Sequence, residues 1–80
     1  MSFNLFEEVA LARDLPEEGL RRGDVATVVE RIPSGGAEDG YALELFNSLG
    51  QTIKVIVVPE SALEALTADE VWSVRPLKRA

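Results

Sequence analysis

Apolar and polar residues alternate along most of this 80-residue chain, a pattern typical of β-strands that bury one face. The alternation predicts strands at residues 8–12, 24–32, 41–46 and 52–58, and a closing strand at residues 72–77. β-branched side chains are concentrated in the second and fourth of these segments, which favours a pleated, half-buried sheet. Prolines and glycines stand between the segments and predict the turns that join them.

The connections complete the predicted architecture. Pro59 has no amide hydrogen to give to a sheet, so we expect residues 60–66 to form a short helix after it. Thr67 and Glu70 have capping-box spacing, so residues 68–71 fit either a further helical turn or strand. A mainly β chain of five short strands, with a short helix or helical turn before the last one, predicts a small SH3-like barrel. A chain of this length is expected to form one domain, residues 1–80.

Charged residues within the strands predict which side chains point inward. Glu30, Glu44, Lys54 and Arg75 are expected to face solvent, so residues of opposite parity should form the core. The predicted core comprises Val9, Leu11, Val25, Val29, Tyr41, Leu43, Leu45, Ile53, Val55, Val57, Trp72 and Val74, joined by Leu20 and Leu63. A bulge near Ala26 would reverse the parity of the second strand alone.

The same alternation leaves apolar residues on the outside of the predicted barrel, namely Ala26, Val28, Ala42, Phe46, Ile56, Val58 and Val71. An exposed apolar patch of this kind marks an interaction site, so Val28, Phe46, Ile56 and Val58 are candidate partner-binding residues. Two alternatives stay open: residues 1–6 and 60–66 fold over this face, or it meets a partner or a second copy of the chain. Arg21 and Arg22 form a basic pair that could contact an acidic partner.

Composition argues against catalysis. The chain has no cysteine and no histidine, which excludes disulfides, cysteine-based zinc sites and the usual partners of a nucleophilic serine. The adjacent acidic residues Glu38 and Asp39 lack the alternating ligand spacing of a calcium loop. We therefore expect no enzyme activity and no catalytic residue, cofactor, metal or small-molecule ligand.

Charge and hydropathy limit the partners. The formal net charge is −6, from 14 acidic and 8 basic side chains, and a field of that sign repels phosphate backbones. The longest apolar run, residues 55–58, is far too short to span a membrane, and the N-terminus lacks the pattern of a signal peptide. The expected setting is the cytoplasm, without nucleic acid or membrane contact.

Several stretches resemble a family of small bacterial domains of unknown function, the domain-of-unknown-function family forty-nine twenty-six. The similar segments are residues 6–11, 14–17, 19–30, 50–52 and 75–77. The chain differs from the family pattern at Ala26, where glycine is usual, and in a longer tail, with an insertion at residues 60–70. The resemblance implies an SH3-like barrel with no established activity.

Two functional hypotheses follow. The first is a non-enzymatic module that binds another protein, such as the product of a neighbouring gene, in an antitoxin or immunity role. The second is a barrel associated with nucleic acid, as in translation and transcription factors. The acidic balance favours the first.

Overall fold

The computed structural model describes residues 3–66, which form one antiparallel sheet of five strands. The strands follow the order β4-β3-β2-β1-β5 across the sheet, and no described residue lies in an α-helix. Two short 3₁₀ turns interrupt the strands, η1 at Pro16–Glu18 and η2 at Glu60–Ala62. The prediction of a mainly β, five-stranded fold is confirmed, and the strands are β1 Glu8–Leu11, β2 Val25–Ile32, β3 Gly40–Phe46, β4 Thr52–Pro59 and β5 Leu63–Ala65.

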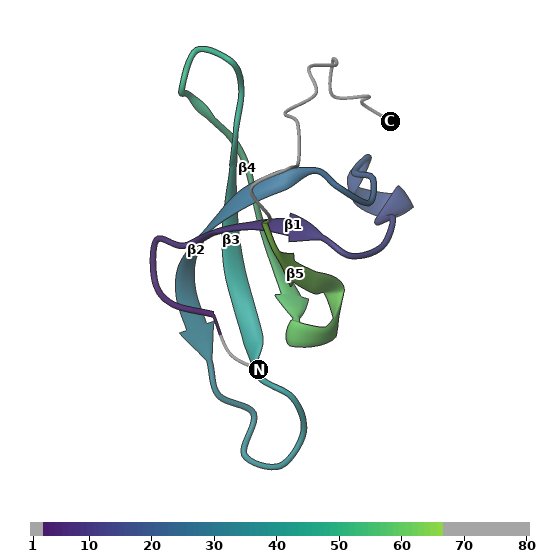
Figure 1. Cartoon of the computed structure of the whole chain (residues 1–80), viewed down its shortest axis with the longest axis vertical. Helices are drawn as coiled ribbons and strands as arrows, with labels where there is room; N and C mark the ends of the chain where they lie inside the picture. Colours follow the sequence, from purple (N-terminus) through teal and green to yellow (C-terminus); the bar gives the residue numbers. More distant parts are fainter. Residues whose placement is uncertain (1–2, 67–80) are drawn as a thin grey trace.

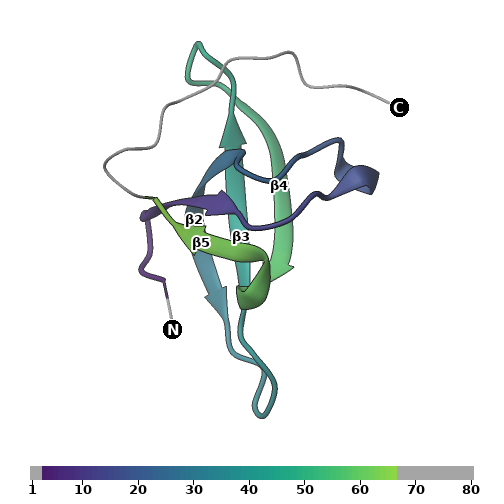
Figure 2. The ribbon, with the colours of Figure 1, turned by 45° about the vertical axis from the view of Figure 1, so that its right-hand side comes forward.

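The sheet is strongly curved, so its two ends form two layers. In both ribbon views β1 crosses in front of β3 (Figures 1 and 2), and in Figure 2 β5 also crosses in front of β3. The long strand β2 pairs with both β1 and β3 and so joins the two layers. The core lies between the layers, with Val9 and Leu11 on one side and Leu43 and Ile56 on the other. This arrangement is compatible with a small barrel-like fold.

The β1–β2 loop also contributes to the core. Leu15 and Leu20 pair with each other through two backbone hydrogen bonds of 3.0 and 3.1 Å, which folds the loop back on itself. Leu20 is buried in the core and Leu15 packs against it. Two apolar residues in an otherwise charged loop thus mark the point where it meets the sheet.

The last described strand differs from the prediction. The expected helix at residues 60–66 is wrong beyond its first turn, because η2 ends at Ala62 and the chain continues as β5. Leu63 pairs with Leu11, and the Ala12 amide donates to the Ala62 carbonyl at 2.8 Å. Pairing with β1 gives this segment partners that an isolated helix of seven residues would lack. The expectations for residues 67–80, including the strand at 72–77 and the core positions Trp72 and Val74, lie outside the described residues.

The predicted inward faces are correct in β1 and β3 and wrong in β2 and β4. Val9, Leu11, Tyr41, Leu43 and Leu45 are buried as expected, and so are Leu20 and Leu63. In the other two strands the buried residues are Ala26, Val28, Ile56 and Val58. Val25 and Val29 are half-buried, and Ile53, Val55 and Val57 are exposed.

Strand register explains the reversal. Leu43 lies directly opposite Val28 on one side and Ile56 on the other, and directly opposed residues point to the same face. Burying Leu43 therefore buries both partners. A bulge near Ala26 was considered as a way to reverse the parity of β2, and the register of β2 in fact shifts between Val28 and Glu30. Glu30 lies opposite Ala42 and Arg31 opposite Tyr41, so the two faces alternate again beyond this bulge.

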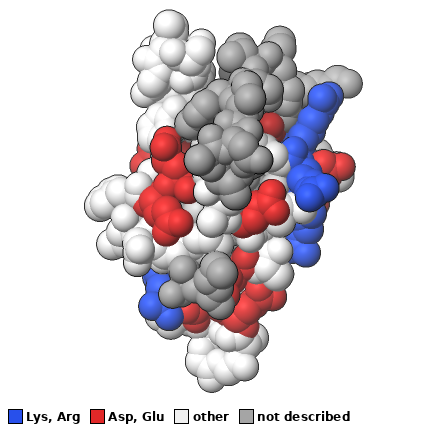
Figure 3. All heavy atoms as spheres, viewed as in Figure 1, with Lys and Arg blue, Asp and Glu red and all other residues white. Residues whose placement is uncertain are grey.

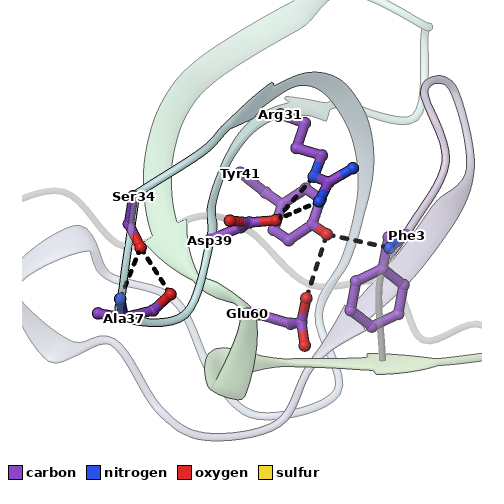
Figure 4. A network of polar contacts seen from close by, with 7 residues as sticks. All are labelled: Phe3, Arg31, Ser34, Ala37, Asp39, Tyr41 and Glu60. Carbon is purple, nitrogen blue, oxygen red and sulfur yellow. Dashed lines mark hydrogen bonds and ion pairs between the residues drawn. The ribbon is translucent and has the colours of Figure 1, made fainter.

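A buried polar network closes the end of the core near the chain's start (Figure 4). The Tyr41 hydroxyl accepts a hydrogen bond from the Phe3 amide at 3.1 Å and donates one to Glu60 Oε1 at 3.2 Å. The two aromatic rings meet edge to face, with centroids 5.6 Å apart. Because Tyr41 is fully buried, both functions of its hydroxyl need partners, and the network supplies them.

Candidate partner-binding surface

The outer side of β4 carries a row of exposed apolar residues. Val55 and Val57 are 58% and 62% exposed, and Ile53 before them is 39% exposed. Ile56 and Val58, which alternate with them, point into the core. We call Ile53, Val55 and Val57 the β4 outer row. Because β-branched residues stand on both sides, β4 resembles a strand that is buried on both faces.

Two carboxylates lie beside this row. Glu44 is directly opposite Val55, and Glu30 and Val57 are both directly opposite Ala42. The Thr52 hydroxyl donates to Glu44 Oε2 at 2.6 Å, which holds that carboxylate against the start of β4. The surface is therefore an apolar strip bordered by negative charge.

The predicted partner-binding residues of the strands do not share one exposed surface in the structure. Val28, Ile56 and Val58 are core residues, so the expectation that they face outward is wrong, for the register reason given above. Phe46 is exposed at the end of β3, as expected. The residues that the sequence reasoning missed are those of the β4 outer row, and the uninterrupted apolar run from Val55 to Val58 was the signal for a strand with two apolar faces.

Arg21 and Arg22 lie on the β1–β2 loop rather than on a face of the sheet. Both are exposed. Their backbone amides donate to Asp24 Oδ2 at 2.8 Å and to Asp14 Oδ1 at 2.9 Å, so two acidic side chains shape this turn. In the space-filling view, basic side chains lie at the right-hand margin and at the lower left (Figure 3). Because Arg21 and Arg22 belong to the β1–β2 loop, strand pairing does not place them beside the β4 outer row.

Residues 3–6 and 60–66, one of the two alternatives for what meets the predicted outer face, contribute to the core on the side of Ile56 and Val58. Phe3 packs in the core against Tyr41, and Ala62 of η2 is also a core residue. Neither residues 3–6 nor residues 60–66 bury Val55 or Val57, which stay exposed. Of the two alternatives for the predicted outer face, the described residues support a cover: Phe3 and Ala62 belong to the same core cluster as Val28, Ile56 and Val58.

A second exposed apolar feature lies in the turn before β1. Phe6 is 73% exposed and has a φ of 65°, in the left-handed region that non-glycine residues rarely adopt. Its amide donates to the Val28 carbonyl at 2.6 Å, and the Glu7 side chain accepts from the Asn4 amide at 2.9 Å. These bonds hold the strained turn in place and point a large apolar side chain into solvent.

The acidic pair in the β2–β3 loop is engaged within the fold. Glu38 accepts hydrogen bonds from the Ser61 amide at 2.6 Å and from its hydroxyl at 3.1 Å. Asp39 accepts a hydrogen bond from Arg31 Nε at 2.7 Å (Figure 4). That bond and the Asp39 charge raise the pKa of Arg31 above its ordinary value. Within residues 3–66, no group of three or more potential metal ligands lies together.

Comparison with known proteins adds one finding. A family model described as "Domain of unknown function (DUF4926)" matches residues 5–65. The chain belongs to the DUF4926 family. The DUF4926 match begins in the turn that contains Phe6 and ends with the last residue of β5, so it spans all five described strands. Comparison with curated proteins and with solved structures found no significant match.

The family match confirms the resemblance for the segments within residues 5–65. The similar segment at residues 75–77 lies outside the DUF4926 match. No helix among the described residues is long and apolar enough to cross a membrane.

Proposed function

We propose that this DUF4926 domain is a non-enzymatic module that binds another protein through the β4 outer row. One concrete form is an antitoxin or immunity protein for the product of a neighbouring gene in the bacterial cytoplasm. The observation that carries the proposal is that β4 is apolar on both sides although its outer side is exposed. Apolar patches of this kind on a small domain mark interaction sites.

The apolar composition of the β4 outer row supports a role in binding. A strand that faces water on one side normally alternates apolar and polar residues. Glu44 keeps that rule on β3, but Val55 opposite it breaks the rule on β4. Burial of Val55 and Val57 against a partner would favour association, by about 1.5–3 kcal/mol for each side chain that becomes fully buried. Ordering the partner opposes part of this gain.

Nucleic acid binding is the alternative function, and the surface gives it little support. The carboxylates of Glu30 and Glu44 border the β4 outer row and would repel a phosphate backbone. Lys54 of β4 has its side-chain amine bonded to Glu18 instead. A protein is therefore the better-supported class of partner.

A capture experiment tests the proposal. Tagged full-length protein is incubated with native lysate, with and without nuclease, and compared with a variant that combines Val55→Thr and Val57→Thr. Threonine keeps the branched shape that suits a strand but adds a hydroxyl. Leu49→Thr is the control, because Leu49 is 80% exposed in the β3–β4 turn and is not part of the row.

We expect a nuclease-resistant protein partner whose capture falls at least about tenfold in the double variant, equivalent to about 1.4 kcal/mol. Capture by the Leu49→Thr control should be unchanged, and circular dichroism should show both variants folded. Equal capture by the double variant and the control, or capture that nuclease abolishes, would contradict the proposal.

A further inference from the structure

The charges carried by the strands are sorted between the two sides of the sheet. Glu8 is opposite Thr27, Thr27 is opposite Glu44, and Glu44 is opposite the exposed Val55, so these positions share the outer side. Glu64 is half-buried and lies opposite Ala10, which alternates with the core residue Val9 and so shares the outer side, although Ala10 is itself fully buried. The acidic residues of the described strands all lie on the outer side: Glu8, Glu30, Glu44 and Glu64.

The basic residues of these strands lie on the inner side and are paired there. Arg31 is opposite the buried Tyr41, and its Nη2 is 2.6 Å from Asp39 Oδ2. Lys54 is opposite the buried Leu45, and its Nζ is 3.0 Å from Glu18 Oε1. Among the described strand residues, no Lys or Arg therefore offsets the carboxylates on the outer side. Figure 3 shows the same imbalance on the β1 and β5 layer, where acidic side chains lie across the middle of the view.

We propose that the β4 outer row binds a cationic segment of another protein, in which Lys or Arg alternates with apolar side chains. This inference rests on the proposed protein-binding function and names the chemistry of the partner. Apolar side chains of the segment would cover Val55 and Val57, while its cations would lie over Glu44 and Glu30. An extended segment has the required period, because its side chains alternate every second residue as those of β4 do.

The same charges argue against other occupants. A second copy of the chain would bring like carboxylates together across the contact, which is unfavourable for association. Anionic lipid headgroups and nucleic acids would meet the same repulsion. A cationic partner gains from long-range attraction to the outer side as well as from apolar contact at the row.

The test uses full-length ¹⁵N-labelled protein and two synthetic nine-residue peptides. In one peptide lysine alternates with valine, and in the other glutamate replaces lysine. We expect the lysine peptide to shift the amide signals of Val55 and Val57, with at least about tenfold higher affinity than the glutamate peptide. Raising the salt from about 0.05 M to about 0.5 M should weaken binding severalfold, because screening shortens the reach of the charges.

Variants that remove charge test whether Glu30 and Glu44 attract the lysine peptide. Combining Glu30→Gln with Glu44→Gln should weaken lysine-peptide binding about tenfold while leaving the β4 outer row intact. Combining Glu17→Gln with Asp14→Asn is the matched control, because it removes the same two charges from exposed positions in the β1–β2 loop and Asn keeps the oxygen that accepts from the Arg22 amide. Equal binding of the two peptides, no shift at Val55 and Val57, or equal effects of the double variant and the control would overturn the inference.

The outcomes separate this inference from the function on which it rests. If lysate capture depends on Val55 and Val57 but the lysine peptide shows no preference, the protein-binding function stands and the cationic partner is wrong. If capture is independent of both valines, the function itself fails. The emission of Trp72, the chain's single tryptophan, supplies a further check. If Val57→Lys changes the emission of Trp72 when no partner is present, the surface is assigned to residues 67–80. That result would overturn both the proposed function and the cationic-partner inference.

Discussion

Lys54 reaches across 36 positions of sequence to Glu18, where its Nζ donates to the backbone carbonyl at 2.9 Å and lies 3.0 Å from Oε1. The contact joins β4 to the 3₁₀ turn η1 of the β1–β2 loop. It lets the lysine stem run along the end of the core while the amine stays at its rim, so a charged residue shares the face of Ile56. Glu18 thus supplies a partner for the Lys54 amine on the inward side of β4.

The first prediction concerns this contact. Lys54→Met keeps the aliphatic stem but leaves the Glu18 carbonyl without its donor, and should lower the free energy of unfolding by about 1 kcal/mol. Glu18→Gln removes the ion pair but not the carbonyl, and should cost about 0–0.5 kcal/mol, because partly exposed pairs contribute little. Urea unfolding measures both values. A larger loss for Glu18→Gln than for Lys54→Met would show that the carbonyl bond is not the stabilising contact.

The second prediction tests the faces of β4. Ile56 is 6% exposed, so Ile56→Ala should destabilise the domain by about 2–4 kcal/mol through lost burial and a residual cavity. Val55→Ala, at the neighbouring exposed position, should cost less than about 0.5 kcal/mol. Thermal or urea unfolding of the two variants provides the comparison. Comparable losses at both positions would mean that the outer side of β4 is also packed.

The third prediction concerns the Tyr41 hydroxyl. Tyr41→Phe removes the acceptor of the Phe3 amide and the donor to Glu60 in a buried position, and should cost about 1–3 kcal/mol. Glu60→Gln keeps an oxygen acceptor for the hydroxyl and should cost less. Hydrogen exchange at the Phe3 amide should accelerate in Tyr41→Phe. If exchange and unfolding both match those of the unchanged protein, the hydroxyl contributes nothing to stability.

The fourth prediction concerns backbone strain at Phe6. Asn tolerates a φ of 65° better than Phe does, because its side chain can bond locally to the backbone. Since Phe6 is largely exposed, Phe6→Asn loses little packing and should stabilise the domain by about 0.5–1 kcal/mol. Thermal unfolding measures the change, and Leu5→Asn, at an exposed neighbour without positive φ, is the control. Destabilisation by Phe6→Asn but not by Leu5→Asn would show that the Phe6 side chain makes a stabilising contact.

The local pattern of the sequence determined much of the fold. Alternation and β-branched residues located β1 to β4 close to their observed bounds, since those signals report the strand period directly. Gly23 and Gly50 stand between predicted strands, where glycines indicated turns, and their φ angles are 91° and 80°. The apolar pair Leu15 and Leu20 marked the loop that folds back onto the core.

The tertiary structure decided which side of each strand is buried. A strand such as β4, with apolar residues on both sides, has no inward direction of its own, and the charge of Lys54 pointed to the wrong one. The register against Leu43 set the direction, because directly opposed residues share a face. The end of the fold also depended on distant partners: residues 63–65 form a strand because β1 supplies hydrogen bonds that no local pattern encodes. For the same reason, the exposed β4 outer row could be identified only after the strands were paired.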